Sequence, residues 1–178
     1  MIPYLVPMPM TGDIPGRTRK SIEAQTEPVG IVECRAEGKG REGEAAARKE
    51  CQRQCGMRNE ILPVEYVICA DPDRACLDSN DNYKVMVDNV KDARAFLEAN
   101  KDFGAVSLVE PSRGRDEDDK RIPDIGWVMY RYEVFAALDF TQKPAKGENC
   151  LCGIVAKQIR AMGKRFGYMD ETTRIMHC

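Results

Sequence analysis

Hydrophobic residues follow helix and strand spacing through most of the chain after residue 40. Residues 41–58 are rich in Ala, Arg, Lys and Glu, which favour a helix. Residues 84–100 and 149–166 carry apolar side chains at intervals of three and four, which predicts two amphipathic helices. Residues 61–70 and 126–140 are rich in β-branched and aromatic residues, which predicts two strands.

Two shorter segments, residues 105–109 and 172–176, favour further strands. The predicted order over residues 61–178 is then strand, helix, strand, strand, helix, strand. Right-handed crossovers place both helices of such an order on the same face of the sheet. The sequence therefore predicts a ferredoxin-like α+β domain at 61–178, a βαββαβ sandwich with two helices on one face of a four-stranded sheet.

Residues 1–40 differ from the rest because prolines and glycines interrupt them. We expect this segment to form an extended N-terminal arm, with one short strand at residues 31–34, followed by the helix at 41–58. An apolar arm of this kind needs another surface to cover it. We therefore expect a set of its side chains to bind a neighbouring protein subunit: Ile2, Tyr4, Leu5, Val6, Met8 and Met10.

Charge and hydropathy exclude some classes of protein. The 27 basic and 29 acidic residues nearly cancel, which argues against a protein whose main task is to hold nucleic acid. No apolar run approaches the roughly 18 residues of a membrane span, and residues 1–7 lack the basic start of a signal peptide. We expect a protein without a signal peptide or transmembrane segment, located in the cytoplasm or in a virion.

The eight cysteines suggest a thiol or metal site. Cys51, Cys55, Cys69 and Cys76 could ligate zinc, but their spacing departs from the usual knuckle turns with about two to four intervening residues. Buried thiols also behave as small hydrophobic groups, so Cys51 and Cys55 could simply form the apolar face of a helix without binding a metal ion. In a reducing compartment we expect free thiols and no cofactor, with zinc as the alternative.

Candidate catalytic groups are few. The single histidine, His177, is the second-to-last residue of the sequence, where chains usually fray. Asp71 and Asp73 follow a predicted strand, which is a common place for metal-binding or catalytic acids. They also flank Pro72, and the preference of these residue types for turns is enough to explain an ordinary turn here. We favour the turn interpretation, so no catalytic residue is predicted.

Residues 126–132 contain glycine and aromatic residues in a pattern that faintly echoes an RNA-binding strand. An open sheet face could then bind nucleic acid through Trp127, Met129, Arg131 and Phe135. The leading hypothesis remains a non-catalytic structural or assembly subunit of a larger homo- or hetero-oligomeric complex, such as a virion component or an accessory subunit. The alternatives are an RNA- or single-strand-binding module and a cysteine-ligated metal or thiol redox protein.

Overall fold

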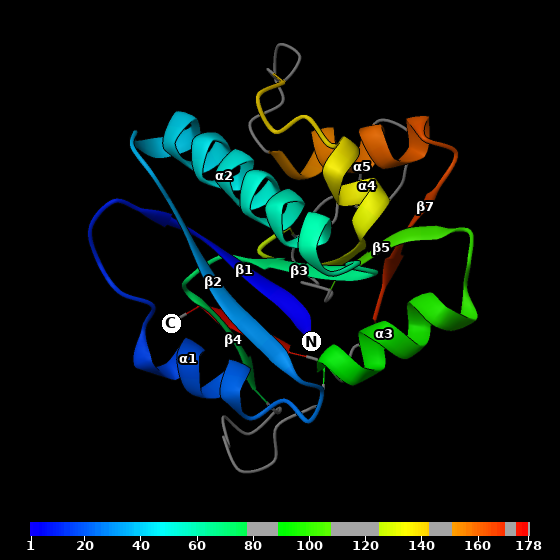
Figure 1. The fold of residues 1–178 in the computed structure, drawn as a ribbon, viewed down its shortest axis with the longest axis horizontal. Helices are drawn as coiled ribbons and strands as arrows, with labels where there is room; N and C mark the ends of the chain where they lie inside the picture. Colours follow the sequence, from blue (N-terminus) through cyan, green and yellow to red (C-terminus); the bar gives the residue numbers. More distant parts are fainter. Residues whose placement is uncertain (78–88, 108–124, 143–150, 170–173, 178) are drawn as a thin grey trace.

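A computed structural model describes residues 1–77, 89–107, 125–142, 151–169 and 174–177. In this part of the chain, five helices flank a six-stranded mixed sheet, and two further strands form a separate small sheet (Figure 1). The strand order of the large sheet is β2-β1-β3-β6-β5-β7.

The first half of the chain builds the part of the sheet that concerns function. Its elements are β1 (Ile2–Pro9), α1 (Gly16–Glu23), β2 (Val29–Ala36), α2 (Gly40–Ile61) and β3 (Tyr66–Ala70). Strand β1 pairs in parallel with β2 on one side and with β3 on the other. Because helices cover both faces, β1 and β3 read as nearly continuous apolar runs.

The second half completes the sheet. Strand β6 is antiparallel to both β3 and β5, and β7 is parallel to β5 at the edge. Within the described residues, strands β4 and β8 pair with each other and form a separate two-stranded sheet. The elements are β4 (Arg74–Leu77), α3 (Asn89–Ala99), β5 (Phe103–Ser107), β6 (Trp127–Arg131), α4 (Tyr132–Ala137), α5 (Leu151–Ala161), β7 (Arg165–Tyr168) and β8 (Arg174–His177).

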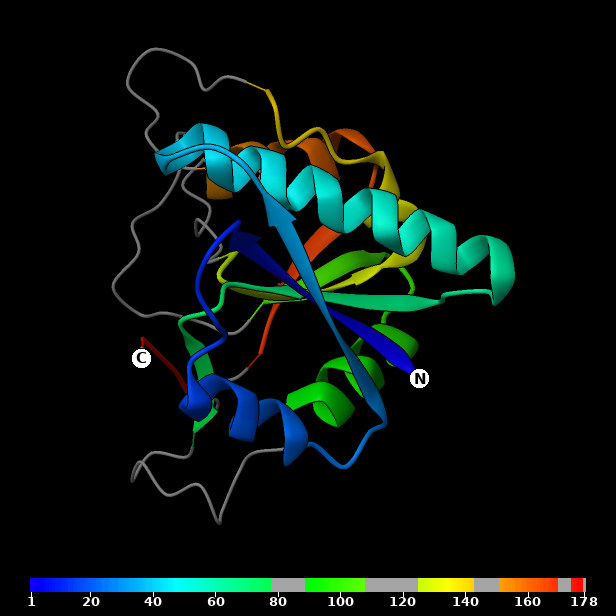
Figure 2. The ribbon, with the colours of Figure 1, turned by 60° about the vertical axis from the view of Figure 1, so that its left-hand side comes forward.

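Two hydrophobic cores lie on the two faces of the sheet. Helices cover both of these faces (Figures 1 and 2). Helices α2, α4 and α5 cover one face, where Cys51 and Val155 pack against Leu5 of β1. Helices α1 and α3 cover the other face, where Ile22 and Leu97 contribute to the second core. No helix in the described residues is long and apolar enough to cross a membrane.

The ferredoxin-like prediction is wrong. The sheet has six strands rather than four, and α3 and α5 lie on opposite faces rather than on the same face. The helices predicted at 41–58 and 149–166 are confirmed by α2 and α5, and the helix at 84–100 is confirmed where the structure describes it. The order of elements was misread because strands β1, β4 and β7 were not predicted.

The predicted N-terminal arm is the main error, because residues 1–40 form β1, α1 and β2. Successive residues of a strand direct their N–H groups to opposite neighbours. The N–H of Ile2 donates to the carbonyl of Pro28 at 2.9 Å, so the even positions of β1 bond toward β2. Pro3, Pro7 and Pro9 occupy odd positions and leave that ladder intact, and on the β3 side the pairing is confined to two residues.

The strand predicted at 126–140 is also shorter than expected. It ends at Arg131, and α4 begins at the next residue. Strand β7 takes the last residues of the segment 149–166 that was predicted as helix, and β8 pairs with β4 instead of extending the large sheet. The loop expected at 110–124 lies outside the described residues.

Candidate functional site

The ends of β1, β2 and β3 meet at one edge of the sheet because these strands run parallel. The chain leaves β1 for α1 on one face and leaves β2 for α2 on the other face (Figure 1). The connections therefore diverge next to β1. In open α/β sheets, a ligand typically binds at the carboxyl ends of the strands where the connections diverge in this way.

A cavity of about 420 Å³ opens at this position. This volume is within the usual range of ligand pockets. The ends of β1 and β2 form an apolar wall, a glycine-rich turn forms a second wall, and three carboxylates complete the lining. The lining residues are Pro7, Met8, Pro9, Ala36, Gly38, Gly40, Gly43, Glu44, Ala47, Asp71, Pro72 and Asp73.

The glycine-rich turn connects β2 to α2. Gly38 and Gly40 have φ angles of +125° and +54°, in the region that disfavours residues with a side chain. Helix α2 begins at Gly40, so the positive end of a 22-residue helix lies at the cavity. The turn therefore brings backbone, rather than side chains, against whatever occupies the cavity.

Asp71 and Asp73 enter the cavity because β3 ends at Ala70. The N–H of Asp71 donates to the carbonyl of Gly126 at 2.8 Å, which fixes this residue to the entry of β6. The N–H of Arg74 then donates to the carbonyl of Asp71 at 3.1 Å and closes a turn. The turn predicted from the sequence is real, and it places both carboxylates on the cavity wall.

Arg48 of α2 connects the carboxylates. Its side chain is fully buried, and Nη2 lies 2.5 Å from Oδ1 of Asp71. Nε lies 3.2 Å from Oε1 of Glu44 one helical turn earlier, and Nη1 donates to Sγ of Cys69 at 3.3 Å. Burial alone would lower the pKa of Arg48, but the charges of Asp71 and Glu44 outweigh it and hold the pKa above its ordinary value.

Among the described residues, the lining contains three carboxylates and no basic side chain. Arg48, behind the wall, offsets one negative charge, so the cavity favours cations. Within the described residues, no group of three or more His, Cys, Asp or Glu side chains is placed to hold a metal ion by itself. The oxygen ligands of Asp71 and Asp73 instead suit Mg²⁺ or Mn²⁺ bound by one or two carboxylates together with phosphate oxygens of a ligand.

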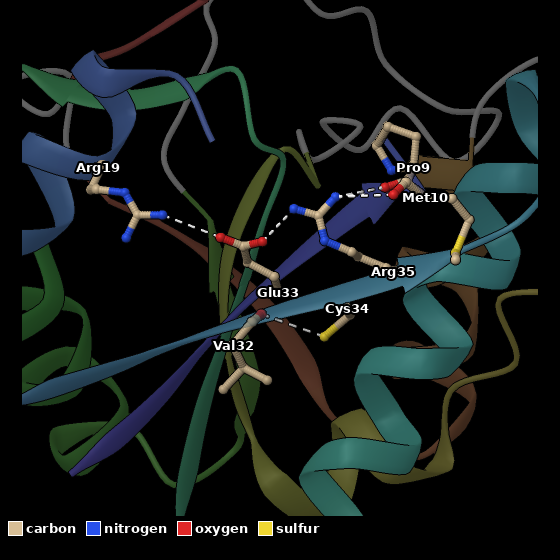
Figure 3. A network of polar contacts seen from close by, with 7 residues as sticks. All are labelled: Pro9, Met10, Arg19, Val32, Glu33, Cys34 and Arg35. Atoms are coloured by element: carbon tan, nitrogen blue, oxygen red, sulfur yellow. Dashed lines mark hydrogen bonds and ion pairs between the residues drawn. The ribbon is translucent and has the colours of Figure 1, made fainter. Parts of the chain in front are cut away.

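A polar network holds the end of β1 at the cavity (Figure 3). Arg35 of β2 donates to the carbonyls of Pro9 and Met10 at 3.2 and 3.4 Å. Glu33 lies 2.5 Å from Arg35 and 3.2 Å from Arg19 of α1. This network ties the apolar wall of the cavity to the neighbouring strand and to α1.

The zinc alternative stays a prediction, because one of its four thiols is not among the described side chains. Cys51, Cys55 and Cys69 are free buried thiols beside Cys34 in the core under α2, and they do not form a metal site. Burial and hydrogen bonds to Cys34 and Cys69 raise the pKa of Cys51. For Cys69, the hydrogen bond with Cys51 instead lowers the pKa of the thiol. The side chain of Cys76 lies outside the described residues. Cys152 is disulfide-bonded, contrary to the expectation of free thiols.

The open sheet face proposed for nucleic acid does not exist. Trp127, Met129, Arg131 and Phe135 are all buried. Trp127 and Met129 belong to the core under α1 and α3, and Phe135 belongs to the core on the opposite face. Stacking with bases requires exposed aromatic faces, so the RNA-binding alternative is wrong.

The residues expected to bind a partner are mostly internal. Met10 is exposed, but the others are buried on the two faces of β1: Ile2, Tyr4, Leu5, Val6 and Met8. They bury their side chains within this chain rather than offering them to a neighbour.

The solved structures that resemble this chain share its α/β fold. A197 from STIV superposes with a TM-score of 0.57 at 12% identity, covering 100% of this chain and 86% of that one. A glycosyltransferase involved in glycosylation of the major capsid of PBCV-1 gives 0.55 at 14%, covering 95% and 81%. A mutant Drosophila β-1,4-galactosyltransferase 7, in complex with manganese, UDP-Gal and xylobiose, gives 0.54 at 13%, covering 99% and 71%.

No protein-family model matches the chain, and no curated protein matches it. At these identities, the structural resemblance establishes the fold. Two of these structures are transferases, and the cavity of this chain lies where open α/β sheets typically bind ligands. The prediction of a non-catalytic structural subunit or virion component is therefore contradicted.

Sequence reasoning missed the glycine-rich turn, Glu44 and Arg48. The signal that could have found them is a strand followed directly by Gly38, Gly40 and Gly43 and then by a helix. The arm interpretation of residues 1–40 separated the strand from the helix and hid this pattern. Asp71 and Asp73 were recognised as candidates but were assigned to an ordinary turn.

Proposed function

We propose that this chain is a glycosyltransferase that uses a nucleoside-diphosphate sugar as donor. Asp71 and Asp73 would hold a divalent cation that binds the donor diphosphate. One observation carries the proposal: two carboxylates leave the end of a central parallel strand and line a cavity beside a glycine-rich turn. The galactosyltransferase of similar fold, which contains manganese and UDP-Gal, supports it.

The charge of the cavity explains why a cation is needed. In the described part of the cavity, a diphosphate would meet Glu44, Asp71 and Asp73 without a facing basic side chain. Like charges in a partly enclosed site repel one another strongly. A bound Mg²⁺ or Mn²⁺ would neutralise the phosphates and stabilise the negative charge that develops on the leaving group.

The residues of this chain would bind and orient the donor. Pro7, Pro9 and Ala36 provide an apolar surface for the nucleoside, and the turn at Gly38–Gly43 admits the ligand close to the backbone. In the reaction, an acceptor hydroxyl oxygen forms a bond to the anomeric carbon and loses its proton. The bond from that carbon to the phosphate oxygen breaks, and the nucleoside diphosphate leaves with the electron pair.

The test is donor binding and turnover by the purified chain. We expect UDP and UDP-sugars to bind in calorimetry with Mn²⁺ present, and EDTA to abolish the binding. Slow release of UDP should follow when water replaces the acceptor. A panel with UDP-glucose, UDP-galactose, UDP-N-acetylglucosamine and GDP-mannose should identify the preferred base and sugar.

The carboxylate variants make the test specific to this cavity. Asp73→Asn should weaken Mn²⁺-dependent UDP binding by at least about tenfold, because an amide is a poorer cation ligand. Asp102→Asn is the matched control, since Asp102 is exposed and pairs with Arg165 at 3.2 Å. UDP binding that survives EDTA, or that is equal in both variants, would refute the proposal.

A further inference from the structure

The guanidinium of Arg48 has a different partner on each of its three nitrogens. Nη2 bonds Asp71, Nε bonds Glu44, and Nη1 bonds the thiol of Cys69. The ring of Phe140 lies 6.0 Å from the guanidinium carbon and closes another side. A buried planar cation with three directional contacts is held in one orientation.

Each of the two carboxylates is bonded by Arg48 through one oxygen only. The contact to Asp71 uses Oδ1, and the contact to Glu44 uses Oε1. Within the described part of the chain, the other oxygen of each carboxylate has no hydrogen bond, and both residues line the cavity. Arg48 thus fixes two carboxylates while leaving one oxygen of each for a ligand.

We propose that Arg48 is the positioning residue of this cavity, holding Asp71 for the cation and Glu44 for a hydroxyl group of the substrate. This inference rests on the proposed function. Glu44 does not share a metal ion with Asp71 and Asp73, because these carboxylates do not form a three-ligand group in the described residues. A carboxylate oxygen that faces a sugar-bearing ligand is a hydrogen-bond acceptor for hydroxyl groups.

A simple counter-charge role for Arg48 makes the opposite prediction for cation binding. If Arg48 only neutralises charge, its replacement by methionine makes the net charge around Asp71 and Glu44 more negative, and Mn²⁺ should bind more tightly. If Arg48 orients Asp71, its removal frees the carboxylate to turn, and Mn²⁺ should bind more weakly. Loss of a group that orients a metal ligand typically weakens metal binding about 10- to 100-fold.

The experiment measures Mn²⁺ alone, by electron paramagnetic resonance, in wild type, Arg48→Lys and Arg48→Met. We expect binding at least about tenfold weaker in both variants, because the compact ammonium of lysine lacks the rigid planar arrangement of donors that reaches all three partners of Arg48. Arg131→Met is the control, since Arg131 is buried on the other face and donates to the carbonyls of Leu97 and Phe103. It should leave Mn²⁺ affinity unchanged. If Arg48→Met does not fold, the Mn²⁺ affinity of Arg48→Lys alone still tests the proposal.

Glu44→Gln tests the hydroxyl contact separately. We expect unchanged Mn²⁺ affinity, a KM for the UDP-sugar raised about tenfold and a smaller change in kcat. The affinities of wild type and Glu44→Gln for UDP and for 2′-deoxy-UDP distinguish a ribose 2′-hydroxyl from a hydroxyl of the transferred sugar. If Glu44 binds the ribose 2′-hydroxyl, wild type should lose affinity for the deoxy ligand and Glu44→Gln should not. Unchanged or tighter Mn²⁺ binding in the Arg48 variants overturns the role of Arg48, and an unchanged KM in Glu44→Gln overturns that of Glu44. A wild-type chain that binds no Mn²⁺ overturns the proposed function as well.

Discussion

Gly43 in the first turn of α2 lies against the backbone of Gly38. A Cβ atom on Gly43 would lie 2.7 Å from both the carbonyl carbon and the carbonyl oxygen of Gly38. Real Cβ atoms do not approach backbone so closely, so the turn can close only with glycine at this position. This contact sets the rim of the cavity, since both residues belong to its lining.

Gly43→Ala should therefore disturb both stability and the cavity. We expect a loss of about 1–3 kcal/mol in the free energy of unfolding, because the new methyl group meets backbone that cannot rotate away. Gly56→Ala in the same helix is the matched control, since no atom lies within 4 Å of a Cβ there. It should stabilise the protein by about 0.5–1 kcal/mol. Urea unfolding of both variants is the measurement, and equal effects would contradict the contact.

The sequence predicts local structure well where one periodicity extends over many residues. The helix at 41–58 and the strand at 61–70 were found because propensity and pattern agree there. The strand ending at Arg131 was overextended, because Tyr132–Ala137 contains residues with high strand propensity that pack as a helix in this fold. Tertiary packing decided between two states that the pattern alone did not distinguish.

The site was harder to predict than the elements, because its residues come together only through the sheet topology. Arg48 and Asp71 are 23 positions apart and belong to a helix and to the end of the next strand. Their contact follows from α2 packing beside β3, which in turn requires β1 to lie between β2 and β3. Because the prolines were interpreted as excluding a strand at residues 2–9, the spacing of Arg48 and Asp71 gave no indication of an ion pair between them.

Arg131 should be a major contributor to stability on the face opposite α2. Its Nη2 donates to the carbonyl of Leu97 at 2.5 Å, and its Nε donates to the carbonyl of Phe103 at 2.8 Å. These bonds join the end of α3 to β5 and β6. We expect Arg131→Met to lower the free energy of unfolding by on the order of 3 kcal/mol, because buried carbonyls lose a charged donor. Thermal or urea unfolding measures this loss, and a change below about 0.5 kcal/mol would show that the bonds add nothing.

Trp127 is the single tryptophan and reports on the core under α1 and α3. It is fully buried, so its fluorescence should resist quenching by iodide in the native protein and become sensitive in about 6 M guanidinium chloride. Oligonucleotides at low salt should leave the emission unchanged, because no ring face is available for stacking. Strong iodide quenching of the native protein would contradict the burial of this residue.

The buried thiol of Cys55 should make the protein less stable at alkaline pH. Burial, reinforced by the neighbouring Cys34, raises the pKa of Cys55 from 9.0 to about 11. The unfolded chain then loses this proton near pH 9 while the folded chain keeps it, so the unfolded state is favoured as pH rises. The contribution of Cys55 is fully present below pH 9 and is lost between pH 9 and about 11.

Cys55→Ala removes this proton and should flatten the decline. The measurement is the urea midpoint in reducing buffer at several values between pH 8 and pH 11, chosen to span the window between the ordinary and the raised pKa. Val155→Ala is the control, because it removes apolar volume from the same core without removing a thiol. It should lower the midpoint by a similar amount at every pH. If Cys55→Ala kept the alkaline slope of the wild type, the ionisation would have to come from other groups in the protein.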